Sequence, residues 1–260
     1  MVSAETLELG ALADPAVVRQ SNLMKSSLIE AIKFAVYRTP IAGSSMAPRY
    51  RYKINPGQLA AMIGFIDATR GTNAAIVEVG VAQGDSSVFI MEHLRTSGDP
   101  RPLVLLDTFS GFTAQNVAYE VDARGKAPGD FAGRFSYTDD TILKRNLRRA
   151  GYQNFRTIRA DATTFNWSSL GPIGAMLLDV DLYQPTASTI AAAVPSLIPG
   201  GGIVLDDCVD GTPDDGASQA YAEYLAESGR PFERVGAKGG IIRGDQPSTF
   251  TERSKLSSAS

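Results

Sequence analysis

Short apolar runs alternate with segments of helical spacing along most of this chain. The runs are continuous rather than alternating, which is typical of strands buried on both faces of a sheet. The segments between them repeat apolar residues at helical intervals. We expect strands at residues 74–81, 103–107, 155–160, 175–180 and 203–206, and helices at residues 86–95, 139–150, 185–197 and 217–228.

This strand–helix alternation predicts an α/β fold, a doubly wound parallel sheet with right-handed crossovers. Residues 232–235 and 240–243 would pair as a closing antiparallel hairpin, which brings the expected sheet to seven strands. Residues 109–136 contain several glycines and little periodicity, so we expect a long loop there.

The N-terminal part has a different pattern. Residues 15–37 predict one or two amphipathic helices, residues 39–55 a loop with a basic-aromatic cluster at 49–53, and residues 56–70 another helix. We therefore expect a helical cap and lid over 1–72, a catalytic domain over 73–244 and a disordered tail over 245–260. The apolar face of the N-terminal helices would suit a homodimer.

Composition narrows the function classes. The 260 residues carry a formal net charge of −3, which gives no support to a nucleic-acid partner. A single cysteine, Cys208, excludes an intrachain disulfide and a cysteine zinc cluster, and His93 is the only histidine. We find no apolar stretch of ~20 residues and no basic leader before an apolar run, so we expect a cytoplasmic protein without a membrane partner.

The first expected strand leads into a glycine-containing turn and then a helix. Gly80 and Gly84 allow a close backbone approach, and the following helix N-terminus offers free N–H groups to an anion. Asp107 ends the second strand, where an acidic residue suits a ribose diol. Asp161 follows the third strand and would suit an adenine edge. Each of these features also has a purely structural reading, as a tight turn or a cap.

Two acidic pairs follow the next two strands. Asp179 and Asp181 are two positions apart, so a strand would project both from one face. Asp206 and Asp207 end the neighbouring strand, and residues 178–183 and 205–208 contain no Lys or Arg. Because four clustered carboxylates repel one another, we expect a hard divalent cation such as Mg²⁺ rather than zinc. The alternative is a set of solvated carboxylates.

These motifs resemble the macrocin O-methyltransferase family over about residues 76–243. The resemblance is carried by EVGVAQGDSS, LLDTFSGF, RADAT, LLDVDLYQPT and GGGIVLDD. It implies a class I methyltransferase fold, with S-adenosylmethionine (SAM) as cofactor and Mg²⁺ as metal. Enzymes of this family methylate sugar hydroxyls of antibiotics, so the resemblance implies the same kind of acceptor. The chain departs from the family's pattern after Gly80, where it reads Gln83-Gly84-Asp85, and at Cys208.

The resemblance also implies a role for each motif residue. Asp179, Asp206 and Asp207 would bind Mg²⁺, and Asp181 would be the general base. The cofactor residues would be Gly80, Gly84 and Ser86 at the methionine end, Asp107 at the ribose, Asp161 on the adenine side, Glu78, Ser110 and Ala162 beside them, and Ser45 and Met46 in a closing loop.

The sequence therefore predicts a SAM- and Mg²⁺-dependent O-methyltransferase for a hydroxyl of a sugar or small natural product. A catechol-type acceptor would satisfy the same diol chemistry. Two other classes stay open: a metal-dependent glycosyltransferase, since an apolar strand ending in Asp-x-Asp also suits a nucleotide-sugar, and a SAM-binding module without catalysis.

Overall fold

The computed structural model describes residues 27–36, 38–39 and 50–245. The chain divides into two compact units between Arg51 and Tyr52. In the first unit, residues 27–36 form a helix inside the segment where helices are expected. The expectations for residues 1–14, for Ser45 and Met46, and for residues 246–260 lie outside the described residues.

The second unit is built on one seven-stranded sheet. Its strand order is β3-β2-β1-β4-β5-β7-β6, with parallel pairing throughout except where β7 pairs with β5 and β6. The strands are β1 (Ala75–Val79), β2 (Leu103–Asp107), β3 (Phe155–Arg159), β4 (Ile173–Leu178), β5 (Leu197–Leu205), β6 (Arg234–Val235) and β7 (Gly239–Arg243). The expected doubly wound sheet with an antiparallel closing hairpin is confirmed.

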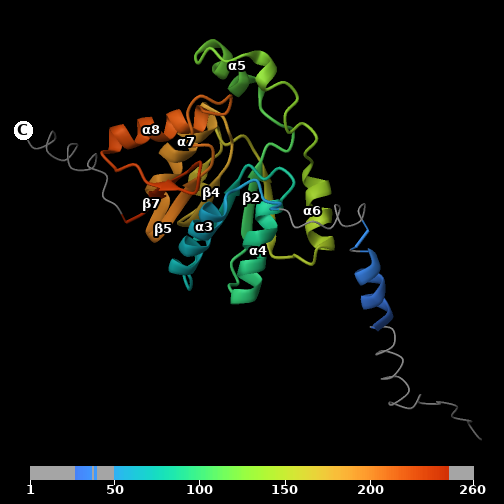
Figure 1. Cartoon of the computed structure of the whole chain (residues 1–260). Coiled ribbons are helices and arrows are strands. Elements are labelled where there is room, and N and C mark those ends of the chain that lie inside the picture. The colour runs from blue at the N-terminus through green and yellow to red at the C-terminus, as the bar shows by residue number, and fades with distance from the viewer. Residues whose placement is uncertain (1–26, 37, 40–49, 246–260) are drawn as a thin grey trace, which may run out of the picture. The chain divides into compact units, whose positions relative to one another are not determined.

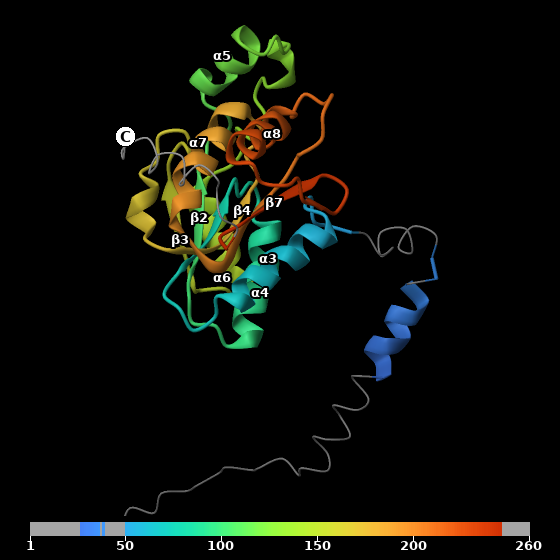
Figure 2. The ribbon, with the colours of Figure 1, turned by 90° about the vertical axis from the view of Figure 1, so that its left-hand side faces the viewer.

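Helices cover both faces of this sheet (Figures 1 and 2). One buried cluster joins α3, α4 and α6 to the side chains of one sheet face, and a second joins α7 and α8 to the other. Successive residues of β1 alternate between them, Ile76 in the first and Val77 in the second. The helices are α3 (Pro56–Ala68), α4 (Asp85–Ser97), α5 (Ala114–Asp122), α6 (Asp140–Arg149), α7 (Tyr183–Ala193) and α8 (Gly216–Ser228).

The structure corrects two expectations for individual elements. The segment 109–136 is not one long loop, because it contains α5 and the short 3₁₀ turn Pro128–Asp130. The helix is only nine residues long, and its buried side chains, Asn116 and Glu120, are polar. Likewise β5 begins at Leu197 rather than at residue 203, and its glycines lie inside the strand. A Cβ at Gly202 would come 2.4 Å from the Phe65 ring of α3, which explains the glycine there.

The position of α3 differs from the expected cap. Pro56 is its first residue, as the sequence predicts, and Asn55 and Gln58 form a reciprocal capping box. Leu59, Met62 and Ile66 are buried in the cluster that packs on the sheet. The helix therefore belongs with the sheet unit and brings its N-terminus to the carboxyl ends of the central strands, where the acidic residues lie.

Candidate functional site

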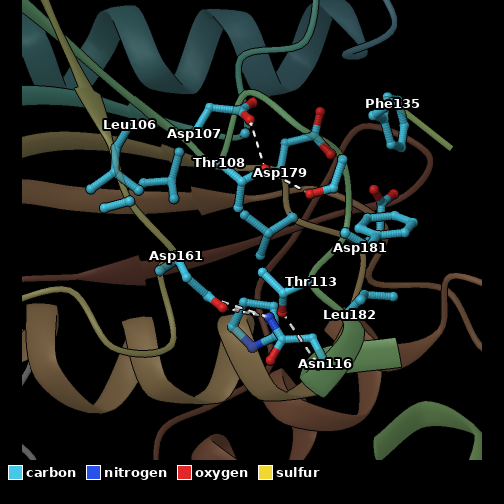
Figure 3. A pocket seen from close by; sticks show the side chains of 18 of the residues that line it. Leu106, Asp107, Thr108, Thr113, Asn116, Phe135, Asp161, Asp179, Asp181 and Leu182 are labelled. Atoms are coloured by element: carbon cyan, nitrogen blue, oxygen red, sulfur yellow. Dashed lines mark hydrogen bonds between the residues drawn. The ribbon is translucent and has the colours of Figure 1, made fainter. Parts of the chain in front are cut away.

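Two adjoining cavities open at the carboxyl ends of β1, β2 and β4. The first contains Asp107, Asn116, Asp161 and Ala162 in its wall, and the second contains Ser86 and the acidic residues that follow β4 and β5. The walls of both include Gly80, Ala82, Phe135, Asp179 and Asp181. Two ligands that bound in these cavities would therefore meet at the turn after β1 and at the Asp-x-Asp segment. Figure 3 shows the first cavity, with the shared residues Phe135, Asp179 and Asp181 labelled.

The turn after β1 has no room for side chains larger than hydrogen at its first glycine. Gly80 has φ +81°, and a Cβ there would lie 1.7 Å from the carbonyl oxygen of Asp179. Gly84, with φ +86°, is the N-cap residue of α4. Ala82 between them also has a positive φ, of 46°. This tight path brings the chain across the end of β4 and aims the backbone N–H groups of the turn toward β2.

Asp107 fastens that turn to the end of β2. One of its carboxylate oxygens accepts hydrogen bonds from the N–H groups of Val81, at 2.7 Å, and Ala82, at 3.3 Å. The other accepts from the N–H of Phe109 at 2.7 Å. Asp107 thus has the structural role that the sequence left open, and its carboxylate also faces the first cavity (Figure 3).

Asp161 is held on the far side of the same cavity. Its carboxylate accepts hydrogen bonds from the side-chain amide of Asn116, at 3.2 and 3.3 Å, and from the N–H of Thr163 at 2.8 Å. The neighbouring Ala162 carbonyl accepts from the indole of Trp167. Asn116 comes from α5 and was missed by the sequence reasoning, because the helix itself was not expected.

Among the expected cofactor residues that the structure describes, three line neither cavity: Glu78, Gly84 and Ser110. Glu78 is fully buried and accepts hydrogen bonds of 2.5 Å from the hydroxyls of Ser86 and Ser87, at the start of α4. Burial outweighs these hydrogen bonds and raises the pKa of Glu78 to about 7. Glu78 therefore lies behind the wall of the second cavity and holds Ser86 in that wall through a hydrogen bond.

Asp179, Asp181 and Asp207 form the acidic centre of the second cavity. Each offers a carboxylate oxygen, and these atoms all lie within 4.8 Å of one another. The strand period does not bring them together, since β4 ends at Leu178 and β5 at Leu205. Instead Asp181 and Asp207 adopt left-handed backbone conformations, with φ of 60° and 53°, that turn their side chains into the cluster.

The surroundings of this cluster disfavour ionised carboxyls. Burial is the main cause that raises the pKa of Asp179 well above its ordinary range, with the charges of Asp206, Asp181 and Asp207 adding to it. For Asp181, burial, the charge of Asp214 and a hydrogen bond to Asp207 raise the pKa in the same way. A cation placed among these oxygens would relieve the repulsion, so the donor set fits a hard divalent ion.

Asp206 has partners of its own. Its two carboxylate oxygens accept hydrogen bonds from the Gln58 amide at 2.9 Å and from the Lys238 ammonium at 2.7 Å. Lys238 also donates to Asp207 at 2.8 Å. The acidic pairs therefore have a neutralising cation, although none lies in their own sequence segments. Lys238 comes from the turn between β6 and β7, 31 residues beyond Asp207, where no local pattern connects it to the acids.

A segment between α5 and α6 covers the acidic centre. The Arg134 guanidinium pairs with Asp214 through two hydrogen bonds and lies 4.0 Å from Asp181. Its central carbon lies 5.4 Å from the centroid of the Phe112 ring and 5.3 Å from that of the Phe135 ring, within cation–π range of both. Phe135, with φ 57°, places its ring in the wall of both cavities. Neither residue was singled out from the sequence, because both fall in the segment expected to be a loop.

The seven-stranded order with its final antiparallel strand, and acidic residues at the ends of β2, β4 and β5, define a class I methyltransferase fold. A methyltransferase domain family (Methyltransf_24) matches residues 77–208, about half of the chain. The chain belongs to this family. The match covers the turn after β1, Asp107, Asp161 and both acidic pairs, and it argues against the glycosyltransferase alternative.

Comparisons with individual proteins agree with this assignment. The chain is 26% identical over 171 residues to 8-demethyl-8-(2,3-dimethoxy-alpha-L-rhamnosyl)-tetracenomycin-C 4'-O-methyltransferase of Streptomyces olivaceus. The match covers 60% of this chain and spans 63% of that relative's length.

Two solved structures share the fold. The O-methyltransferase NovP matches with a TM-score of 0.60 and 17% identity over 76% of this chain and 84% of its own. The calicheamicin methyltransferase CalS11 matches with a TM-score of 0.60 and 19% identity over 95% of this chain and all of its own. Within the part of the chain that the structure describes, no helix is long and apolar enough to cross a membrane.

Proposed function

We propose that this chain transfers a methyl group from SAM to a hydroxyl of a sugar or small natural product. The observation that carries the proposal is the junction of the two cavities at Gly80, Asp179 and Asp181. A donor in the first cavity and an acceptor in the second would meet there, as an in-line displacement requires. The relative that acts on a rhamnosyl group supports a sugar acceptor.

The first cavity supplies what the donor needs. Asp107 would accept hydrogen bonds from the ribose hydroxyls, since its carboxylate is already fixed by backbone N–H groups. Asp161, Asn116 and Ala162 would contact the adenine side. Gly80, in the wall of both cavities, and Ser86, in the wall of the second, would contact the methionine end at the junction. The Phe135 ring would shield the junction from water. Glu78 would act indirectly, by fixing Ser86 and the first turn of α4.

The second cavity supplies the base. Asp181 is buried beside the junction. With a cation among the neighbouring carboxylates, Asp181 would be ionised and would accept the proton of the acceptor hydroxyl on a carboxylate oxygen, an effect worth about 10²- to 10⁴-fold in rate. Asp179, Asp206 and Asp207 would hold Mg²⁺, which would lower the pKa of a bound hydroxyl and orient it. Vicinal hydroxyls would suit such a site, in sugars and in catechols alike.

A direct test is methyl transfer to a panel of acceptors. The purified chain is incubated with SAM and MgCl₂ and with L-rhamnosides, other glycosides and catechols, and products are identified by mass spectrometry. We expect one methyl group on a glycoside hydroxyl and loss of activity with EDTA. Tight cofactor binding without transfer to any member of a broad panel would favour the non-catalytic module instead. Activity that persists in EDTA would refute the Mg²⁺ requirement.

A further inference from the structure

Lys238 is a cation built into the acidic centre. Its ammonium lies 2.7 Å from an oxygen of Asp206 and 2.8 Å from an oxygen of Asp207. The Asp206 side chain is 2% exposed and the Lys238 side chain 29% exposed, so the pair is sheltered but reaches the second cavity. Ion pairs between fully exposed side chains contribute little, but this pair lies largely out of solvent.

The backbone around Lys238 holds the side chain in place. The Lys238 carbonyl accepts a hydrogen bond from the N–H of Cys208, at 2.6 Å, next to Asp207. One residue earlier, the N–H of Ala237 donates to the side chain of Asn55 at 3.0 Å. The β6–β7 turn is thus attached both to the end of β5 and to the N-terminus of α3. The ammonium reaches the acids from a fixed base rather than from a free surface loop.

Gln58 completes the arrangement around Asp206. The amide of this fully buried residue donates to Asp206 at 2.9 Å and to the carbonyl of Leu205 at 3.1 Å. Both carboxylate oxygens of Asp206 are therefore engaged, one by Gln58 and one by Lys238. Asp206 and Asp207 are also two of the three residues proposed above to hold Mg²⁺. An ammonium and a divalent cation on the same oxygens would repel each other strongly in this sheltered position.

We propose that Lys238 is an internal counter-ion that competes with the divalent cation for Asp206 and Asp207, so that the cation binds by exchange with the ammonium. This inference rests on the cation site of the proposed function. The metal-free chain then keeps part of its acidic charge neutralised by Lys238, while its affinity for the cation is lower than the carboxylates alone would give. The exchange frees the ammonium from both carboxylates.

The test is a calorimetric titration of the full-length, metal-free chain with MnCl₂. Lys238→Gln removes the charge but keeps a hydrogen-bond donor. It therefore separates competition between the ammonium and the cation from a role in which Lys238 only orients the two carboxylates. We expect Lys238→Gln to bind Mn²⁺ at least about tenfold more tightly than the wild type, and Lys238→Arg to bind about as weakly as the wild type. Lys144→Gln is the matched control, since Lys144 pairs with Asp140 at 2.8 Å away from both cavities and should not change the affinity.

A second experiment measures the reactivity of Lys238 in the wild type, so its result does not depend on whether a variant folds. Acetylation of lysines, followed by mass spectrometry, should show Lys238 becoming more reactive when MgCl₂ is added, with Lys144 unchanged. Equal or weaker Mn²⁺ binding by Lys238→Gln, or unchanged Lys238 reactivity in a wild type that binds the ion, would overturn the exchange while leaving the cation site intact. Absence of Mn²⁺ binding in wild type and variant alike would overturn both the exchange and the proposed cation site.

Discussion

The backbone N–H of Val81 donates a hydrogen bond of 2.7 Å to the carboxylate of Asp107, which ties the turn after β1 to the end of β2. One side chain thereby closes the gap between two neighbouring strands at the rim of the first cavity. The same carboxylate is the group proposed to hold the ribose of SAM. We therefore expect Asp107 to contribute both to the conformation of the turn after β1 and to the binding of SAM.

Substitution of Asp107 separates these two roles. Asp107→Asn retains one carbonyl acceptor for the turn but loses the charge that strengthens hydrogen bonds to ribose hydroxyls. Such bonds are worth about 1.5–3 kcal/mol, so S-adenosylhomocysteine should bind about 10- to 100-fold more weakly. Calorimetric titration measures this. Asp122→Asn, on the exposed side of α5, is the control and should bind like the wild type. Equal affinity for Asp107→Asn would remove the residue from the cofactor site.

Gly80 provides a second prediction, on stability. Gly80→Ala adds a Cβ that would lie 1.7 Å from the Asp179 carbonyl oxygen, so the turn and the end of β4 must move apart. Gly98→Ala is a matched control, because Gly98 has a similar φ of +71° but nothing within 4 Å of the added Cβ. We expect the control to cost about 1–2 kcal/mol, from the left-handed backbone alone. Urea unfolding should show a much larger loss for Gly80→Ala. Equal losses would contradict the close approach.

Glu78 predicts a pH dependence of stability. Its pKa is raised by burial from an ordinary 4.5 to about 7, so between these values the folded chain binds a proton that the unfolded chain has released. Stability from this group is full below about pH 4.5 and falls as the pH rises to about 7, by roughly 3 kcal/mol.

Glu78→Gln should flatten the pH profile, since glutamine does not titrate. Urea unfolding at about pH 5, low in this interval, and at about pH 8, above it, should show a smaller loss of stability for the variant than for the wild type. Glu227→Gln, on the exposed face of α8, should keep the wild-type slope. An unchanged slope in Glu78→Gln would show that Glu78 is already ionised in the folded chain.

Asp181 provides the prediction for catalysis. Asp181→Asn keeps the shape of the side chain but cannot accept the hydroxyl proton, so the turnover number should fall about 10²- to 10⁴-fold. Binding of S-adenosylhomocysteine should change little, because the cofactor contacts are made by other residues. Asp210→Asn, an exposed residue that bonds to Ser218, should retain activity. Near-normal turnover in Asp181→Asn would assign the base to another group.

Much of the fold could be predicted because its strands are buried on both faces and therefore appear as continuous apolar runs. The run at β2 matched its strand residue for residue. By contrast, α5 was missed because its buried side chains, Asn116 and Glu120, are polar. The helix does repeat apolar residues at helical spacing, but over only nine residues this signal was not recognised; the residues are Ala114, Val117, Ala118 and Val121.

The site shows the same limit. Acidic residues at strand ends could be found because sheet topology gathers them at one edge. Lys238 and Gln58 could not, since their contacts with Asp206 join residues 32 and 148 positions apart. The convergence of Asp179 and Asp181 was expected from the strand period, but the left-handed backbone at Asp181 produces it. Local patterns therefore located the acids without showing which partners neutralise them.

The most direct test of the central claim is a calorimetric titration of the purified chain with S-adenosylhomocysteine, with and without Mg²⁺. The account predicts binding with a dissociation constant in the micromolar range, because the first cavity offers a fixed carboxylate at each end for the adenosine. It also predicts binding without Mg²⁺, since Asp107 and Asp161 stand apart from the cation site. An absence of binding under both conditions would contradict the proposed methyl transfer from SAM.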